Sequence, residues 1–266
     1  MKNAAFLGAV AAAAVATAAS AQSSTMIYQT GFNSSEGYVA GDINGQNGWS
    51  TYQPTAGSGY ASVTFTAPPG FEGDGAFRLD SGINASTSPR YAWPGGYGAT
   101  WDGLVASQGY DTLQVTTSMY LGSGSTSTAR LGLVNFDSTG TKILGGFYVQ
   151  ANTGIVYMLG YYNNAGTLNN YAFNTGVTLG YDQWTEVTTT WNRTTGRFEL
   201  YWGENGFYVD GAGAGSTADE TDFYVTRNGS AISTLAYFDN LRIEAVPAPG
   251  AIALLGLAGL TSRRRR

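Results

Sequence analysis

Residues 184–202 read WTEVTTTWNRTTGRFELYW and predict a β-hairpin. Two apolar series alternate with polar residues: Val187, Thr189 and Trp191, then Phe198, Leu200 and Trp202. Such alternation is typical of a strand that lays one face against a core. The five residues between the two series, 192–196, end in glycine, which favours a short hairpin loop.

Alternation of this kind recurs along the chain, whereas no stretch between residues 22 and 245 shows sustained i, i+3, i+4 helical spacing. Further strands are predicted at 62–66, 76–80, 113–121, 129–137, 143–150, 155–159, 223–227 and 235–245. About ten to twelve short strands separated by Gly, Asn and Ser turns indicate an all-β, two-sheet antiparallel sandwich or jelly roll. We therefore predict one such domain over residues 22–245.

The composition excludes several classes of chemistry. The chain has 266 residues and 38 glycines, but no cysteine and no histidine. It therefore has no disulfide, thiol nucleophile, Ser-His-Asp triad or His-ligated metal. Residues 22–245 carry eight basic and all 18 acidic residues, a net charge of −10. This acidic balance argues against nucleic acid or anionic lipid as a partner.

Residues 1–21 are predicted to form the helix of a secretory signal peptide. Lys2 supplies the positive start, residues 4–19 are apolar except for one threonine, and Ala19 and Ala21 fit the small-x-small cleavage pattern. An uncleaved membrane helix is the alternative, but the stretch is alanine-rich and shorter than the roughly 20 apolar residues that span a bilayer. We expect an exported protein.

The last 21 residues, 246–266, combine three features in order. They are a proline box (Val246, Pro247, Ala248, Pro249), an apolar run at 250–260 expected to be a short helix, and an arginine cluster (Arg263, Arg264, Arg265, Arg266). The prolines stop the preceding strand and keep the backbone extended for a protease. The run is too short to span a membrane alone, and the arginines would stay cytoplasmic. The segment therefore predicts a temporary membrane anchor with a cleavable hinge.

This arrangement resembles the PEP-CTERM sorting signal of bacteria. In that family an exosortase-type membrane protease recognises a Val-Pro-Glu-Pro box and removes the tail. Here Ala248 stands where glutamate is commonest. The resemblance implies a cell-surface or extracellular-matrix protein, often in organisms that make exopolysaccharide, with the exosortase-type protease as a transient partner. It implies nothing about what residues 22–245 bind.

Several body segments resemble the concanavalin A-like lectin/glucanase superfamily, which includes laminin-G-like domains. They are residues 28–32, 45–49, 183–201 and 236–243. The resemblance implies two packed antiparallel sheets whose first and last strands are adjacent. It does not fix a function, because this architecture hosts lectins, hydrolases, lyases and scaffolds.

The acidic residues give little support for catalysis. The Glu-x-Asp-x-x-Glu strand of the superfamily's glucanases is absent. The densest acidic run, Asp219, Glu220 and Asp222, follows a glycine-rich loop and is interpreted as a solvated turn. Related lyases use histidine, which this chain lacks. We expect a protein that is not an enzyme.

Aromatic residues in glycine-rich turns are better candidates for binding. Residues 91–101 hold Trp93, Tyr97 and Trp101 among turn formers, and a second turn holds Tyr161 and Asn163. Exposed rings stack on sugar faces, and amides bond hydroxyls in either sense. The alternative is that these rings cap the ends of the sandwich. Asn-x-Ser/Thr sequences carry little weight, because the resemblance of the tail implies a bacterial source.

A structural calcium ion is a further possibility for an exported, cysteine-free acidic domain. Asp239 and Asn240 in the last strand are the predicted ligands, with Asp42 or Asn44 added if the first and last strands are neighbours. An ordinary buried carboxylate bonded to backbone is the alternative.

Taken together, the sequence predicts an exported, non-catalytic surface or matrix protein that associates with extracellular polysaccharide through aromatic-rich loops. It touches the membrane only through its C-terminal tail before processing. A structural matrix protein without a specific ligand is the first alternative. A polysaccharide hydrolase or lyase is the second.

Overall fold

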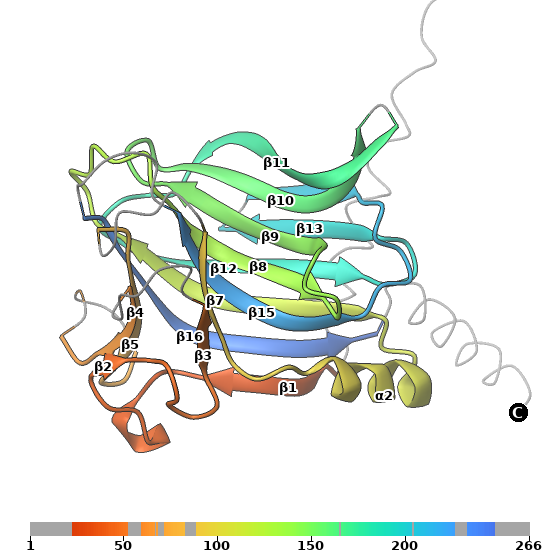
Figure 1. Ribbon diagram of the computed structural model, residues 1–266, viewed down its shortest axis with the longest axis horizontal. Coiled ribbons are helices and arrows are strands. Elements are labelled where there is room, and N and C mark those ends of the chain that lie inside the picture. The colour runs from red at the N-terminus through yellow and green to blue at the C-terminus, as the bar shows by residue number, and fades with distance from the viewer. Residues whose placement is uncertain are drawn as a thin grey trace, which may run out of the picture.

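A computed structural model of the chain describes residues 23–52, 60–66, 68, 72–82, 89–164, 166–203, 205–226 and 233–247. Within these residues it contains sixteen strands in two antiparallel sheets packed as a sandwich, as predicted (Figure 1). The predicted terminal helices, signal cleavage site, Ala248, Pro249 and the arginine cluster lie outside the described residues. No helix within the described ranges is long and apolar enough to cross a membrane.

The first sheet has nine strands. Their order is β14 (Asn205–Asp210), β13 (Arg197–Trp202), β12 (Trp184–Asn192), β7 (Thr112–Leu121), β16 (Leu235–Val246), β5 (Ala76–Asp80), β4 (Ala61–Thr64) and β2 (Gly41–Asp42), and β1 (Thr25–Thr30) also pairs with β16. The first described strand thus lies beside the last, with Thr25 opposite Ala245, as the superfamily resemblance implied.

The second sheet has seven strands. Their order is β11 (Thr167–Thr178), β10 (Ile155–Asn164), β9 (Ile143–Gln150), β8 (Arg130–Asp137), β15 (Ala218–Thr226), β6 (Arg90–Trp93) and β3 (Ser50–Tyr52). A 3-10 turn, η2 (Ser34–Glu36), and one α-helix, α2 (Gly98–Gln108), complete the described elements. Figure 1 shows β11 at one end of the molecule and β1 with α2 at the other.

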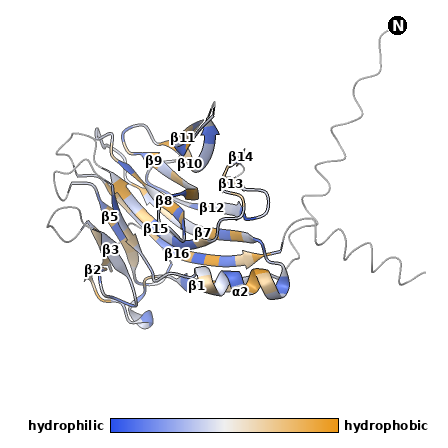
Figure 2. Ribbon diagram, turned by 45° about the vertical axis from the view of Figure 1, so that its right-hand side comes forward, coloured by the Kyte–Doolittle hydropathy of each residue, from blue (hydrophilic) through white to orange (hydrophobic). Residues whose placement is uncertain are grey.

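The predicted hairpin is confirmed. Strands β12 and β13 pair with Val187 opposite Trp202 and Trp191 opposite Phe198. Every residue of the two predicted apolar series is buried. The same alternation of hydrophobic and hydrophilic residues is visible within single strands in Figure 2.

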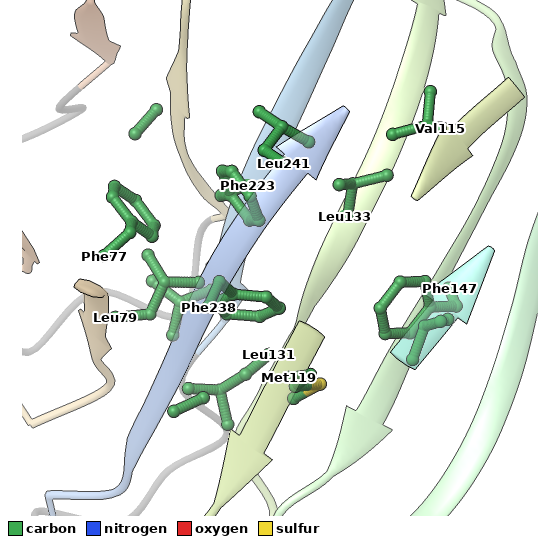
Figure 3. Close-up of a cluster of buried hydrophobic side chains, with 14 of the residues drawn as sticks. Phe77, Leu79, Val115, Met119, Leu131, Leu133, Phe147, Phe223, Phe238 and Leu241 are labelled. Carbon is green, nitrogen blue, oxygen red and sulfur yellow. The ribbon is translucent and has the colours of Figure 1, made fainter. Parts of the chain in front are cut away.

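Aromatic rings join the two sheets at the centre of the core. Phe77 on β5 and Phe238 on β16 each place their ring centroid 4.7 Å from that of Phe223 on β15. Figure 3 shows these rings beside aliphatic residues from both sheets, including Leu131 and Met119. All of them are buried. Phe223 is therefore a central contact through which β15 packs on the opposite sheet.

The prediction of about ten to twelve strands was too low, and the short helix α2 was not predicted. Strand β11 was missed because Asn, Gly and Thr dominate it, although Tyr171, Phe173 and Val177 alternate along it. Helix α2 was missed because it is short. Only Trp101, Leu104 and Val105 carry the helical spacing, and all three contact the core.

Replacing the ring that joins the sheets tests this account of the core. We expect Phe223→Ala to lower the free energy of unfolding by about 3–5 kcal/mol, because it leaves a cavity between the sheets. Tyr208→Ala is the matched control, since Tyr208 is exposed and only stacks on Arg197, a contact worth about 1 kcal/mol or less. Urea denaturation of both variants measures the difference, and equal losses would contradict the assignment of Phe223.

Candidate functional site

The outward face of the seven-stranded sheet carries a row of tyrosines. Strand pairing aligns Tyr91, Tyr224, Gly132, Tyr148 and Tyr157 on five adjacent strands. We call the four tyrosines the tyrosine row. The rings of Tyr148 and Tyr157 stack with centroids 4.6 Å apart, and those of Tyr91 and Tyr224 lie 6.2 Å apart. The row is therefore a set of aromatic contacts that runs across five strands of the sheet.

Glycine in the middle of the row has a steric reason. A Cβ atom at Gly132 would lie 2.0 Å from the carbonyl oxygen of Phe147, so no side chain fits there. The rings of Tyr148 and Tyr224 meet edge to face over this gap, 6.3 Å apart. Tyr148 and Tyr224 are buried, whereas Tyr91 and Tyr157 remain half-buried. The two ends of the row are therefore its accessible parts.

Charged residues border the row. The guanidinium of Arg130, an exposed residue, lies 5.1 Å from the centre of the Tyr148 ring. The ammonium group of Lys142 lies 5.8 Å from the ring of Tyr161 and 3.8 Å from the buried carboxylate of Asp137. Cations over ring faces are attracted by the ring quadrupole. They place positive charge beside an aromatic surface on an otherwise acidic protein.

Asp222 lies within this face and is the main feature that sequence reasoning missed. The acidic run 219–222 is part of β15 and not a solvated turn, so that prediction was wrong. Asp222 is 3% exposed, and its buried Oδ1 has no hydrogen-bond partner in the described structure. Burial raises the pKa of Asp222 to about 9, and the charge of Glu220 adds to the rise. The carboxyl group is therefore protonated at neutral pH.

The rings around Asp222 explain its burial. Asp222 on β15 lies opposite Val134 on β8. This pair stands between the Tyr224–Gly132 pair and the Glu220–Phe136 pair of the same two strands. The Tyr91 ring extends past this pair and meets the ring of Phe136 edge-on, with the ring centroids 5.6 Å apart. Burial raises the pKa of Tyr91 to about 12, and the nearby Asp222 contributes. A carboxyl group enclosed by rings on an outward sheet face is unusual, because buried polar groups normally have partners.

Three of the predicted binding residues share this face. Trp93 follows Tyr91 by two residues on β6 and is half-buried. On β10, Tyr161 and Asn163 follow Tyr157 at multiples of two residues and so lie on the same sheet face. Tyr161 is half-buried, and Asn163 is exposed. The Oδ1 of Asn163 accepts a 2.9 Å bond from Gly166 N–H at the β10–β11 turn. The structure thus brings together residues from two distant sequence segments.

The other two predicted binding residues are buried, so their assignment to sugar stacking was wrong. The Tyr97 hydroxyl bonds that of Thr221 at 2.9 Å, and Trp101 donates its indole N–H to the Tyr110 carbonyl at 3.0 Å. The glycine-rich segment does not end in a loop but starts α2. Asp219 accepts the Gly98 N–H at 2.8 Å there, where a negative charge is favoured.

The predicted calcium ligands already have other partners. The carboxylate oxygens of Asp239 accept backbone N–H bonds from Glu72 (3.1 Å) and Asn240 (2.7 Å). Burial raises the pKa of Asp239 to about 6. Asn240 has a φ of 52° and donates to the Glu72 side chain at 3.2 Å.

The remaining predicted ligands do not complete a calcium site. Asp42 and Asn44 bond within their own segment, where Asn44 N–H donates to Asp42 and Thr51 N–H to Asn44. Among the described residues no three acidic, histidine or cysteine side chains are grouped to hold a metal. The residues as arranged do not fit a calcium ligand set, and calcium stays a prediction from the sequence.

The chain matches no protein-family model and no curated protein. Its fold is similar to that of a conserved carbohydrate esterase from the Shiga toxin-encoding bacteriophage phi24B (TM-score 0.50, 15% identity, 85% of this chain and 100% of that chain). It is also similar to the cellulose induced protein Cip1 (TM-score 0.50, 12% identity, 79% and 98%). A sialidase is matched at TM-score 0.47 and 11% identity over 77% of this chain, which spans 18% of the sialidase. At these identities the likeness shows a β-sandwich fold alone.

The buried carboxyl predicts an unusual dependence of stability on pH. An aspartate in the unfolded chain has a pKa near 3.9. Between about pH 4 and pH 9 the folded state therefore holds a proton that the unfolded state lacks, so rising pH lowers the free energy of unfolding. We expect Asp222→Asn, which cannot ionise, to gain thermal stability relative to the unsubstituted protein as the pH rises from 5 to 8.5. Parallel melting profiles would contradict the enclosed, neutral carboxyl.

Proposed function

We propose that this chain is an exported surface or matrix protein that associates with extracellular polysaccharide through the outward face of the seven-stranded sheet. The observation that carries the proposal is the tyrosine row, whose ends Tyr91 and Tyr157 remain accessible. Four strand spacings separate them, about 19 Å at roughly 4.8 Å each. That length suits a chain of several sugar rings and not a single small molecule.

The chemistry of the face supports this proposal. Aromatic rings stack on the C–H faces of sugars, and polar groups beside them fix orientation. Trp93 and Tyr161 extend the row on β6 and β10. Arg130 and the exposed Asn174, which pairs with Tyr157, supply donors and acceptors at its border. Two proteins of similar fold are described as a carbohydrate esterase and a cellulose induced protein. A carbohydrate-associated role for this chain agrees with that likeness.

Binding by the purified chain tests the proposal. Native electrophoresis through gels containing one soluble polysaccharide, neutral or uronate-rich, measures retardation of an acidic protein. We expect retardation by at least one polysaccharide, and an affinity about tenfold lower for Tyr157→Ala and Tyr161→Ala, equivalent to about 1.4 kcal/mol. Tyr208→Ala removes an exposed tyrosine from the other sheet and serves as the control. Unchanged binding by both Tyr157→Ala and Tyr161→Ala would refute a binding site on this face of the seven-stranded sheet.

Polysaccharide cleavage is the second candidate, favoured by one observation. Glu220 and Asp222 lie two residues apart on β15, so their side chains leave the same sheet face. Burial raises the pKa of both carboxyl groups. Glycosidases need one protonated and one ionised carboxyl group. We favour binding without cleavage, because Asp222 is enclosed. New reducing ends that disappear in Asp222→Asn would establish cleavage.

We also propose that the chain is exported by its N-terminal signal and processed at its C-terminus by an exosortase-type protease. The proline box begins where the last strand ends, since Val246 is the final residue of β16 and Pro247 follows it. The first residue of the box, Val246, is still paired with Thr112 in the sheet, so a protease that reads the box would act at the very end of β16.

Mass spectrometry of the chain expressed in a bacterium that has such a protease tests processing. We expect a product that has lost the arginine cluster, and an uncleaved, membrane-associated product from Pro247→Ala. Ala248→Glu, which restores the commonest box residue, should be cleaved as the unsubstituted chain is. Identical intact masses in hosts with and without the protease would reject this processing route.

A further inference from the structure

A second aromatic surface lies on the opposite side of the sandwich. Strand pairing places Trp184 on β12 opposite Tyr120 on β7, and Tyr120 opposite Tyr237 on β16. Their ring centroids are 5.7 Å and 6.1 Å apart. All three side chains are half-buried, while their neighbours Leu121 and Phe238 point into the core. We call these three residues the aromatic ridge, and it faces outward from the nine-stranded sheet.

Cavities flank the ridge on both sides. One, of about 400 Å³, is lined by Tyr120 and Tyr237 together with a hydroxyl-rich wall: Ser123, Ser125, Ser233 and Thr234. The other, of about 390 Å³, lies between Trp184 and Tyr201 and is also lined by Gln183 and Glu186. Both volumes lie at the lower end of the range of small-ligand sites. The ridge is therefore a raised aromatic strip with a hollow at each side.

The walls of these cavities favour neutral sugars. Hydroxyl groups both donate and accept hydrogen bonds, as sugar hydroxyls do, and the Ser125 and Thr234 hydroxyls already bond each other at 2.5 Å. None of the described residues that line the first cavity is charged at neutral pH. Among those that line the second cavity, only Glu186 is charged. No lysine or arginine is among the described residues that line either hollow, and the nearby Arg242 is already paired with Glu186 at 3.2 Å. A neutral polysaccharide has no carboxylates that would be left unpaired in these cavities, so its binding avoids that free-energy cost.

Sheet stability alone does not account for this arrangement. Cross-strand aromatic pairs stabilise antiparallel sheets, so the ring contacts need no ligand. The residues that follow on the same outward face are polar, however: Ser118, Glu186, Thr116, Thr188 and Arg242. Among the outward-facing residues of β12, β7 and β16 named here, the ridge is the aromatic exception, and it is placed where the surface is hollowed on both sides.

We propose that the aromatic ridge and its two cavities bind a neutral polysaccharide chain, as a site separate from the tyrosine row. Sugar rings stack on Trp184 and Tyr120, and the Ser123 hydroxyl bonds the sugar that enters the first cavity. The Ser233 oxygen, whose hydroxyl donates to Asp80 at 2.6 Å, accepts a bond from the same sugar. With both sites occupied, one molecule joins two polysaccharide chains. The ridge does not depend on the tyrosine row, so either site can fail without the other.

The experiment measures retardation of the full chain in native gels that contain hydroxyethyl cellulose, dextran or mannan, with polygalacturonate as the anionic comparison. We expect at least one neutral glycan to retard the protein, and the affinity for it to fall about tenfold or more in Trp184→Ala. Gly122→Leu fills the first cavity from its wall, at a position where an added Cβ has no atom within 4 Å, and should weaken binding without disturbing packing. Tyr208→Ala, on the same face but outside both cavities, should bind as the unsubstituted chain does.

Fluorescence gives a second measurement. Four of the six tryptophans, Trp49, Trp101, Trp191 and Trp202, are buried, so a glycan on the ridge should change emission mainly through Trp184. That change should be absent in Trp184→Phe and present in Tyr157→Ala.

Three outcomes would overturn the proposal. They are no retardation by any of the three neutral glycans, normal binding by both Trp184→Ala and Gly122→Leu, or neutral-glycan binding that is lost only in Tyr157→Ala. The last result would support the tyrosine row while rejecting the ridge.

Discussion

The contact of Phe223 with Phe77 and Phe238 determines how the rest of the molecule is arranged. It brings together β15 of one sheet and β5 and β16 of the other, with both centroid distances at 4.7 Å. No cysteine is available to join the sheets instead. Because neighbouring side chains on a strand point to opposite faces, burying Phe223 forces Asp222 and Tyr224 outward. The tyrosine row is thus a consequence of the core.

The sandwich could be predicted because its central strands obey a simple rule. In β12, β13 and β7 one face is buried and the other is mostly polar outside the aromatic ridge, so period-two alternation is clear in the sequence. The rule fails at the edges, where β11 has few apolar residues to bury. It also fails for the first half of β15, since only 223–227 was predicted as a strand; Asp222 and Tyr224 are buried along with the inward-facing residues. A strand buried on both faces loses its alternation.

The candidate site was predicted in part for the same reason. Sequence reasoning found Trp93 and Tyr161 because each lies in an aromatic-rich segment. It could not distinguish them from Tyr97 and Trp101, since exposure depends on the path of the chain after Gly98. The tyrosine row was missed because its members come from four separate strands, and only the pairing register aligns them. Single tyrosines in strands carry no signal until that register is known.

Strand β16 has a mechanical consequence. It is twelve residues long, is hydrogen-bonded to β7 on one side and to β5 and β1 on the other, and ends at Val246. If force is applied at Val246 while the sheets are held, it acts along the axis of β16. Its hydrogen bonds to the neighbouring strands are then loaded in shear, all together and not one after another. Shear loading resists force far better than peeling. The pairing of β16 would therefore make its C-terminal end resistant to such a pull.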